Sequence, residues 1–118
     1  IEAVTIETEE VYLTKYARMA VENGKHIHME KPGGTSLDDF EKLIAPSSLI
    51  VTIEDNAVCG GAGQYISSFL SANMHNVINY GFKDDFVHQG TQNELFELYG
   101  LTPDKIATDI IKELKKHE

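Results

Sequence analysis

Three glycines after a short apolar stretch are the first residues in this sequence whose type and spacing could bind a ligand. Gly60, Gly61 and Gly63 follow the apolar run 49–53 and precede a helical pattern. Backbone N–H groups at the start of a helix attract anions, so this turn could hold a phosphate. It has neither the Lys-Ser/Thr of a Walker loop nor the spacing of the dinucleotide fingerprint. The alternative is that the glycines allow close packing of helix on strand.

Two histidines could bind a metal ion. His26 and His28 alternate along a predicted strand and would share one of its faces. His75, His88 and His117 are scattered along the chain, and no third ligand is evident. The alternative is that the two imidazoles pack at the strand, and we expect no metal site.

The remaining reactive or charged residues have structural interpretations beside the chemical ones. Cys59 stands before a predicted helix start, where the helix dipole favours a thiolate, but it has no resolving cysteine or nearby histidine. Glu54 and Asp55 end a predicted strand and could line a polar crevice or form a turn. Asp84 and Asp85 lack the spacing of a calcium loop and are expected to fix a loop.

The composition excludes several classes of function. The 118 residues carry ten Lys and Arg against nineteen Asp and Glu, a net charge of −9, which opposes binding to nucleic acid or to an anionic membrane surface. One cysteine excludes an internal disulfide. No stretch is apolar enough to span a membrane, and the opening residues do not resemble a secretory signal. We therefore expect a soluble, cytoplasmic protein.

Strand and helix patterns alternate along the chain. The run Leu49–Ile53 is apolar without alternation, which is typical of a central strand buried on both faces. The expected strands are 3–6, 25–30, 49–53 and 77–80, and the expected helices are 9–23, 36–44, 62–72, 92–99 and 103–114. This order predicts a single α/β domain over 1–118, a doubly wound parallel four-stranded sheet in the order 2-1-3-4 with helices on both faces.

Residues 1–44 resemble the glucose-fructose oxidoreductase and inositol dehydrogenase family. The similarity lies in a strand and helix followed by Gly24-Lys25-His26 and Glu30-Lys31-Pro32. In that family this segment is the later half of a Rossmann domain, and the lysine of the second motif lies beside the nicotinamide. The resemblance therefore implies Lys31, with its neighbour Glu30, as vestigial catalytic residues. The dinucleotide fingerprint of the family is missing from this sequence.

Residues 45–118 resemble the C-terminal domain of 1-deoxy-D-xylulose-5-phosphate synthase, a thiamine-dependent enzyme of the transketolase group. The similarity runs through VTIEDNAVCGGAGQYI and VINYGFKDDFVHQGTQNELFELYGLTPDKIATDI. In that family the domain helps to form the dimer and borders the active site, whereas earlier domains hold the thiamine diphosphate.

The two resemblances together predict an engineered chimera with its seam between Gly33 and Pro46. It would have no catalytic activity and no cofactor, because neither parent's cofactor site is complete. Two alternatives are a remnant nicotinamide oxidoreductase that uses Lys31, and a dimerising module. Both parent domains are covered by neighbours, so orphaned apolar surface could make a homodimer.

Overall fold

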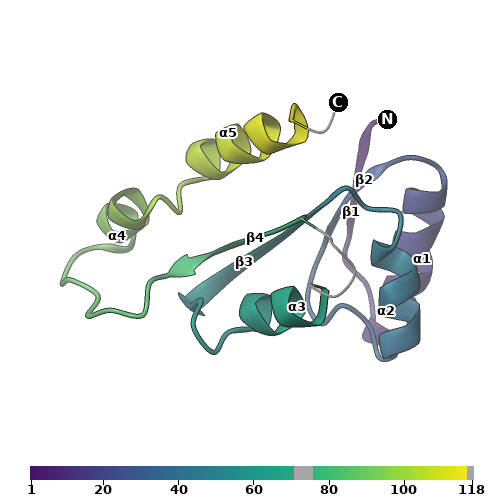
Figure 1. The fold of residues 1–118 in the computed structure, drawn as a ribbon, viewed down its shortest axis with the longest axis horizontal. Helices are drawn as coiled ribbons and strands as arrows, with labels where there is room; N and C mark the ends of the chain where they lie inside the picture. Colours follow the sequence, from purple (N-terminus) through teal and green to yellow (C-terminus); the bar gives the residue numbers. More distant parts are fainter. Residues whose placement is uncertain (71–75, 117–118) are drawn as a thin grey trace. The chain divides into compact units, whose positions relative to one another are not determined.

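The computed structural model describes residues 1–70 and 76–116, and it divides into two compact units, Ile1–Ser47 and Ser48–Glu118 (Figure 1). Each unit contains one pair of parallel strands and the helices that pack on it. That the two units together form the single domain expected from the sequence stays a prediction.

The first unit is a βαβ motif followed by a further helix. Strands β1 (Ala3–Ile6) and β2 (His26–Met29) pair in parallel and are joined by helix α1 (Glu10–Glu22). This motif was predicted, because a helix-length connection between two strands favours parallel pairing. Helix α2 (Leu37–Ile44) is capped by Ser36, whose Oγ accepts a hydrogen bond of 3.4 Å from the Asp39 N–H.

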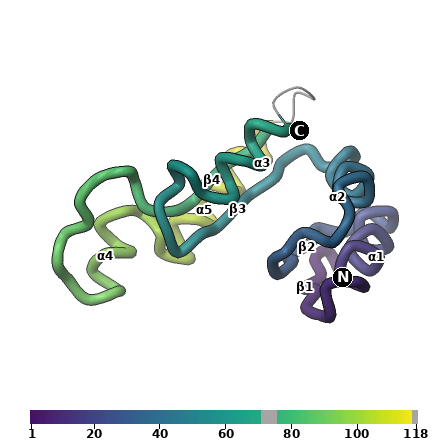
Figure 2. The backbone as a smooth tube through the Cα atoms, turned by 90° about the horizontal axis from the view of Figure 1, so that it is seen from below, coloured from purple at the N-terminus to yellow at the C-terminus, as the bar shows by residue number. Residues whose placement is uncertain are grey.

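The core of the first unit lies between its strands and the two helices, which lie on the same side of the strand pair (Figures 1 and 2). Its buried members are apolar side chains from β1, α1 and α2: Ile6, Leu13, Ala17 and Leu43. Tyr16 and Leu37 belong to the apolar stripes of their helices, yet they are 45% and 57% exposed. Two short strands are too narrow to cover a full helical stripe, so residues at its margin stay in solvent.

The second unit is also built on a parallel strand pair. Strand β3 (Leu49–Ala57), helix α3 (Ala62–Leu70) and strand β4 (Asn76–Phe82) follow one another, and β3 pairs with β4 from Leu49 opposite Asn76 onward. Figure 1 shows α3 on one side of this pair and α5 (Pro103–Leu114) on the other. The helix over α3 was expected to reach residue 72, which lies outside the described residues.

Helix α4 (Gln92–Tyr99) has the predicted capping box. The Glu94 N–H donates to Thr91 Oγ1 at 3.4 Å, and the Thr91 N–H donates to Glu94 Oε2 at 2.8 Å. Hydrogen bonds from the Thr91 backbone and hydroxyl lower the pKa of Glu94.

Phe82 at the end of β4 packs on α4 through an edge contact with Tyr99, with ring centroids 5.2 Å apart. These contacts hold α4 beside the end of the strand.

The prediction of one four-stranded sheet in the order 2-1-3-4 is wrong. The described strands form two separate sheets of two strands each, β1 with β2 and β3 with β4. The prediction took the apolar run in β3 as a strand buried on both faces, yet its residues are only half-buried and Ile53 is 60% exposed. In the described residues β3 pairs only with β4, so one of its edges is unpaired, unlike the edges of a central strand.

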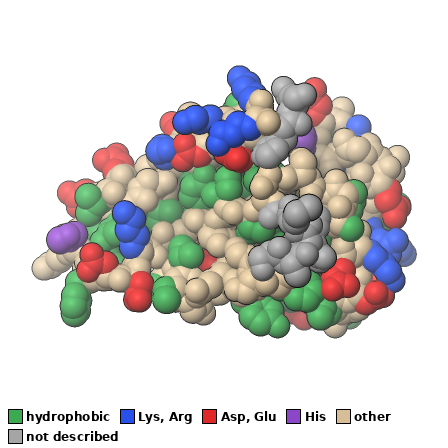
Figure 3. All heavy atoms as spheres, viewed as in Figure 1, with side chains coloured by type: hydrophobic (Ala, Val, Ile, Leu, Met, Phe, Trp, Pro, Cys, Tyr) green, Lys and Arg blue, Asp and Glu red, His purple; other side chains and the backbone are tan. Residues whose placement is uncertain are grey.

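Large apolar side chains remain at the surface of the second unit, where the structure gives them no cover. Hydrophobic side chains are visible among the charged ones in Figure 3. Ile53, Tyr65, Phe86, Leu98 and Ile111 are all more than half exposed. On α5 the buried side chain is Ile106, whereas Ile111 is 53% exposed. None of the helices in residues 1–70 and 76–116 has both the length and the apolar character that a membrane crossing needs.

We predict that Leu13→Ala destabilises the first unit far more than a change on the exposed side of the same helix. Leu13 is 2% exposed, so its truncation should lower the free energy of unfolding by about 2–5 kcal/mol. Val11 is 65% exposed, and Val11→Ala should change it by no more than about 0.5 kcal/mol. Urea denaturation followed by circular dichroism measures both. Equal effects of the two substitutions would contradict the core described above.

Candidate functional site

The start of α3, where the sequence suggested an anion site, is occupied by a carboxylate of the chain itself. Glu54 Oε2 accepts a hydrogen bond of 2.8 Å from the Ala62 N–H, and Glu54 Oε1 accepts one of 2.7 Å from the Gly63 N–H. A negative charge at the first turn of a helix is favoured by the helix dipole and by its unpaired N–H groups. Glu54 therefore supplies the anion that this turn attracts.

The neighbouring N–H groups in the turn also have acceptors. The Gly60 N–H donates to Gln64 Oε1 at 2.6 Å, and the Gly61 N–H donates to the Val58 carbonyl at 3.1 Å. All four backbone N–H groups from 60 to 63 are thus paired within the chain. A phosphate at Gly60, Gly61 and Gly63 would have to displace the Glu54 carboxylate and the Gln64 amide.

A polar network ties this turn to both strands. The Thr52 hydroxyl donates to Asn79 Oδ1 at 2.7 Å, and Asn79 Nδ2 donates to Ser67 Oγ at 2.8 Å. A Cβ at Gly63 would lie 2.3 Å from Thr52 Oγ1 and 2.7 Å from Glu54 Oε1, so only glycine fits there. The network joins β3, β4 and α3. Gly63 allows the helix to pack closely on the strand, which is the alternative that the sequence offered to a phosphate site.

The two residues that the resemblance implied as vestigial catalytic groups lie in solvent. Glu30 and Lys31 follow β2 and are both exposed. The Lys31 N–H donates to Glu30 Oε1 at 3.0 Å, and no hydrogen bond or ion pair involves the Lys31 ammonium in residues 1–70 and 76–116. No side chain in the described ranges therefore positions the Lys31 ammonium.

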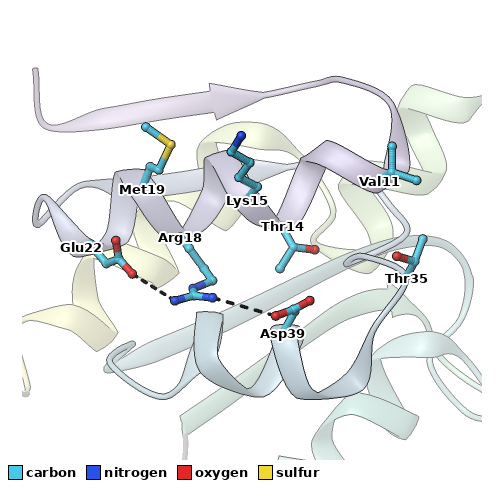
Figure 4. Close-up of a pocket in the computed structure, with 8 residues that line it drawn as sticks. All are labelled: Val11, Thr14, Lys15, Arg18, Met19, Glu22, Thr35 and Asp39. Atoms are coloured by element: carbon cyan, nitrogen blue, oxygen red, sulfur yellow. Dashed lines mark hydrogen bonds and ion pairs between the residues drawn. The ribbon is translucent and has the colours of Figure 1, made fainter.

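An open hollow of about 300 Å³ lies between α1 and α2 (Figure 4). At its centre the Arg18 guanidinium lies 3.3 Å from Glu22 Oε1 and 3.9 Å from Asp39 Oδ1. Two carboxylates thus neutralise the arginine, which leaves it poorly suited to bind an anionic substrate. All three side chains are partly exposed, and ion pairs of this kind contribute little to stability. The hollow supplies polar surface but no reactive group.

The other candidate residues from the sequence are not brought together. Cys59 is exposed with a free thiol, and Asp55, Asp84 and Asp85 are exposed. The described ranges contain no group of three or more His, Cys, Asp or Glu side chains that could hold a metal ion. His75 and His117 lie outside those ranges. In β4, burial and the charge of Asp109 raise the pKa of the Tyr80 phenol.

Glu54 is the residue whose role the sequence analysis missed. Its position carried a usable signal, since an acidic residue directly follows the apolar run 49–53, before a glycine turn and a helix. The first N–H groups of the helix lie at that same end of the sheet, within reach of a carboxylate from the strand.

Comparison with known proteins finds similarity to 1-deoxy-D-xylulose-5-phosphate synthases. The synthase of Clostridium kluyveri is 42% identical over 79 residues, which cover 64% of this chain and 12% of the synthase. That of Pseudoalteromonas translucida is 40% identical over 82 residues, which cover 68% of this chain and 13% of the synthase. That of Aeromonas hydrophila is 46% identical over 61 residues, which cover 50% of this chain and 10% of the synthase. No protein-family model matches the chain.

These matches show homology to a short part of the synthase. Up to about two thirds of this chain are homologous to the enzyme, and the chain spans about an eighth of the length of the curated relatives it matches. A match over 68% of the chain is longer than residues 45–118 alone, so it includes residues before 45. The synthase-like part therefore begins earlier than the boundary expected from the sequence.

We predict that Glu54→Gln weakens the second unit, although the side chain keeps its shape. A glutamine has one carbonyl oxygen for two N–H donors, and its NH₂ group would face one of them. The loss of a charged acceptor should lower the free energy of unfolding by about 1–3 kcal/mol. Asp55→Asn, at an exposed neighbour, should change it by no more than about 0.5 kcal/mol. Urea denaturation distinguishes them, and an unchanged midpoint for Glu54→Gln would contradict the assigned role.

Proposed function

We propose that this chain is a structural α/β segment with no catalytic activity of its own. The observation that carries the proposal is the Glu54 carboxylate on the Ala62 and Gly63 N–H groups. In doubly wound α/β proteins, phosphates and cofactors bind where a strand leads through a turn into a helix. In this chain that position is filled by an internal carboxylate, so the turn serves stability and not ligand binding.

The exposed positions of Glu30 and Lys31 support the same proposal for the first unit. A catalytic lysine needs a cofactor beside it or a partner that exchanges its proton. The Lys31 side chain is exposed and has no hydrogen-bond or ion-pair partner in the described part of the chain. The remnant nicotinamide oxidoreductase is therefore the weaker alternative. Self-association through the exposed apolar side chains stays a prediction.

We predict that the melting temperature of the 118-residue chain does not change with millimolar NAD, NADP or thiamine diphosphate. A ligand stabilises a protein only if the native state binds it, and saturation at 100 times Kd would add about 2.7 kcal/mol. Differential scanning fluorimetry measures the shift, with a nicotinamide-dependent dehydrogenase as positive control. A saturable upward shift with any of the three would contradict the proposal, and its loss in Lys31→Ala would favour the oxidoreductase.

We also propose that the chain is a chimera of two α/β enzymes, a dehydrogenase of the glucose-fructose oxidoreductase type and a 1-deoxy-D-xylulose-5-phosphate synthase. Two observations support it. The synthases named above match 50–68% of the chain, and the first unit, which contains the GKH and EKP motifs, has a hydrophobic core of its own. Because a match over 68% of the chain begins no later than about residue 39, we place the seam between Gly33 and that position.

The chimera proposal predicts a discontinuity in the source DNA. Long sequencing reads that run through the codons for 33–45 should come from a cloned insert. In genomic DNA, the codons before and after this segment should lie at two separate loci. Reads through the same number of codons around Val51 serve as the control, since both sides of Val51 are synthase-like. An uninterrupted genomic reading frame through 33–45 would contradict this origin.

A further inference from the structure

One face of the β1–β2 pair carries two histidines and is open to solvent. Residues alternate between the two faces of a strand. Val4, Ile6, Ile27 and Met29 belong to the core with α1. The alternate positions Ala3, Thr5, His26 and His28 are exposed. The imidazoles of His26 and His28 therefore lie on the face that the helices of this unit do not cover.

The strand register leaves space around the two imidazoles. Ala3 is the partner of His26, and Thr5 is the partner of His28. Both partners are small, so neither blocks the approach of an ion to the ring nitrogens. Positions two residues apart on one strand lie roughly 6.6 Å apart along it, and the side chains project in the same direction. The two rings can thus turn toward one ion between them.

The ring nitrogens are also available. No hydrogen bond, ion pair or ring contact involves either imidazole in residues 1–70 and 76–116. Glu30 is the next residue in the same alternation and is exposed, and the chain has a net charge of −9. The surrounding potential therefore favours a cation.

We propose that His26 and His28 form a two-imidazole site for a divalent transition-metal ion of the Ni²⁺, Cu²⁺ and Zn²⁺ class. Neutral imidazole nitrogen is a preferred ligand of these ions, whereas Mg²⁺ and Ca²⁺ prefer oxygen. The described residues offer no group of three ligands, so water completes the coordination shell. Such a site binds an exchangeable ion at the surface and is independent of the proposed absence of catalysis.

Isothermal titration with Ni²⁺ tests the proposal in a Cys59→Ser background, which removes the free thiol as a ligand. Binding should be saturable with one ion per chain, and 10 mM Mg²⁺ should not compete. His26→Ala or His28→Ala should weaken it by about tenfold or more, because each loses the second point of attachment. The control variant replaces the other three histidines, His75, His88 and His117, with alanine and should bind Ni²⁺ within about twofold of the parent.

Three results would overturn the proposal. They are the absence of saturable binding, unchanged affinity in both single variants, and loss of binding in the control variant. The substitutions lie at exposed positions, and circular dichroism verifies that each variant is folded. In a folded parent, Ni²⁺ should also raise the melting temperature, and the His26→Ala/His28→Ala double variant should show no such rise.

Discussion

The second unit depends on one carboxylate. Glu54 lies within β3, where the pairing with β4 is irregular, and its carboxylate accepts hydrogen bonds from the first N–H groups of α3. These charge-assisted hydrogen bonds join the strand to the helix. The glycine at 63 allows this approach, and Thr52, Asn79 and Ser67 continue the network across β4 and back to the helix. A partly buried polar network of this kind is most stabilising when each member has a partner. Glu54 is the member that satisfies the helix terminus.

The same carboxylate would compete with an external anion at this turn. A helix N-terminus beside the end of a parallel strand attracts anions, and many α/β proteins use that property to bind phosphate. Here the attraction is satisfied within the chain, since the four N–H groups from 60 to 63 already have acceptors. Glycine-rich sequence alone does not distinguish a ligand loop from a structural turn. In this protein the acidic residue of the preceding strand, Glu54, accepts hydrogen bonds from two N–H groups of the turn and helix start.

Local features of the fold could be predicted from the sequence, because short-range interactions determine them. Ser36 and the Thr91–Glu94 pair cap their helices, as these residue types favour at helix starts, and the connections through α1 and α3 join parallel strands. The arrangement of the strands in sheets could not be predicted. An apolar run such as Leu49–Ile53 reads as buried on both faces whether or not a second neighbour exists, and Ile53 is in fact largely exposed. At the site, the glycines were identified, but the contact with Glu54 needs the geometry that brings residues 54 and 63 together.

The most direct test of the central claim is a titration of the chain with inorganic phosphate, followed through the backbone amide resonances of Ala62 and Gly63. If the Glu54 carboxylate holds both N–H groups, these resonances should not move at millimolar phosphate in the wild-type chain. In Glu54→Ala they should shift with phosphate. Saturable shifts of the Ala62 and Gly63 amides in the wild-type chain would contradict the account, because they would show that an external anion binds where the internal carboxylate is placed.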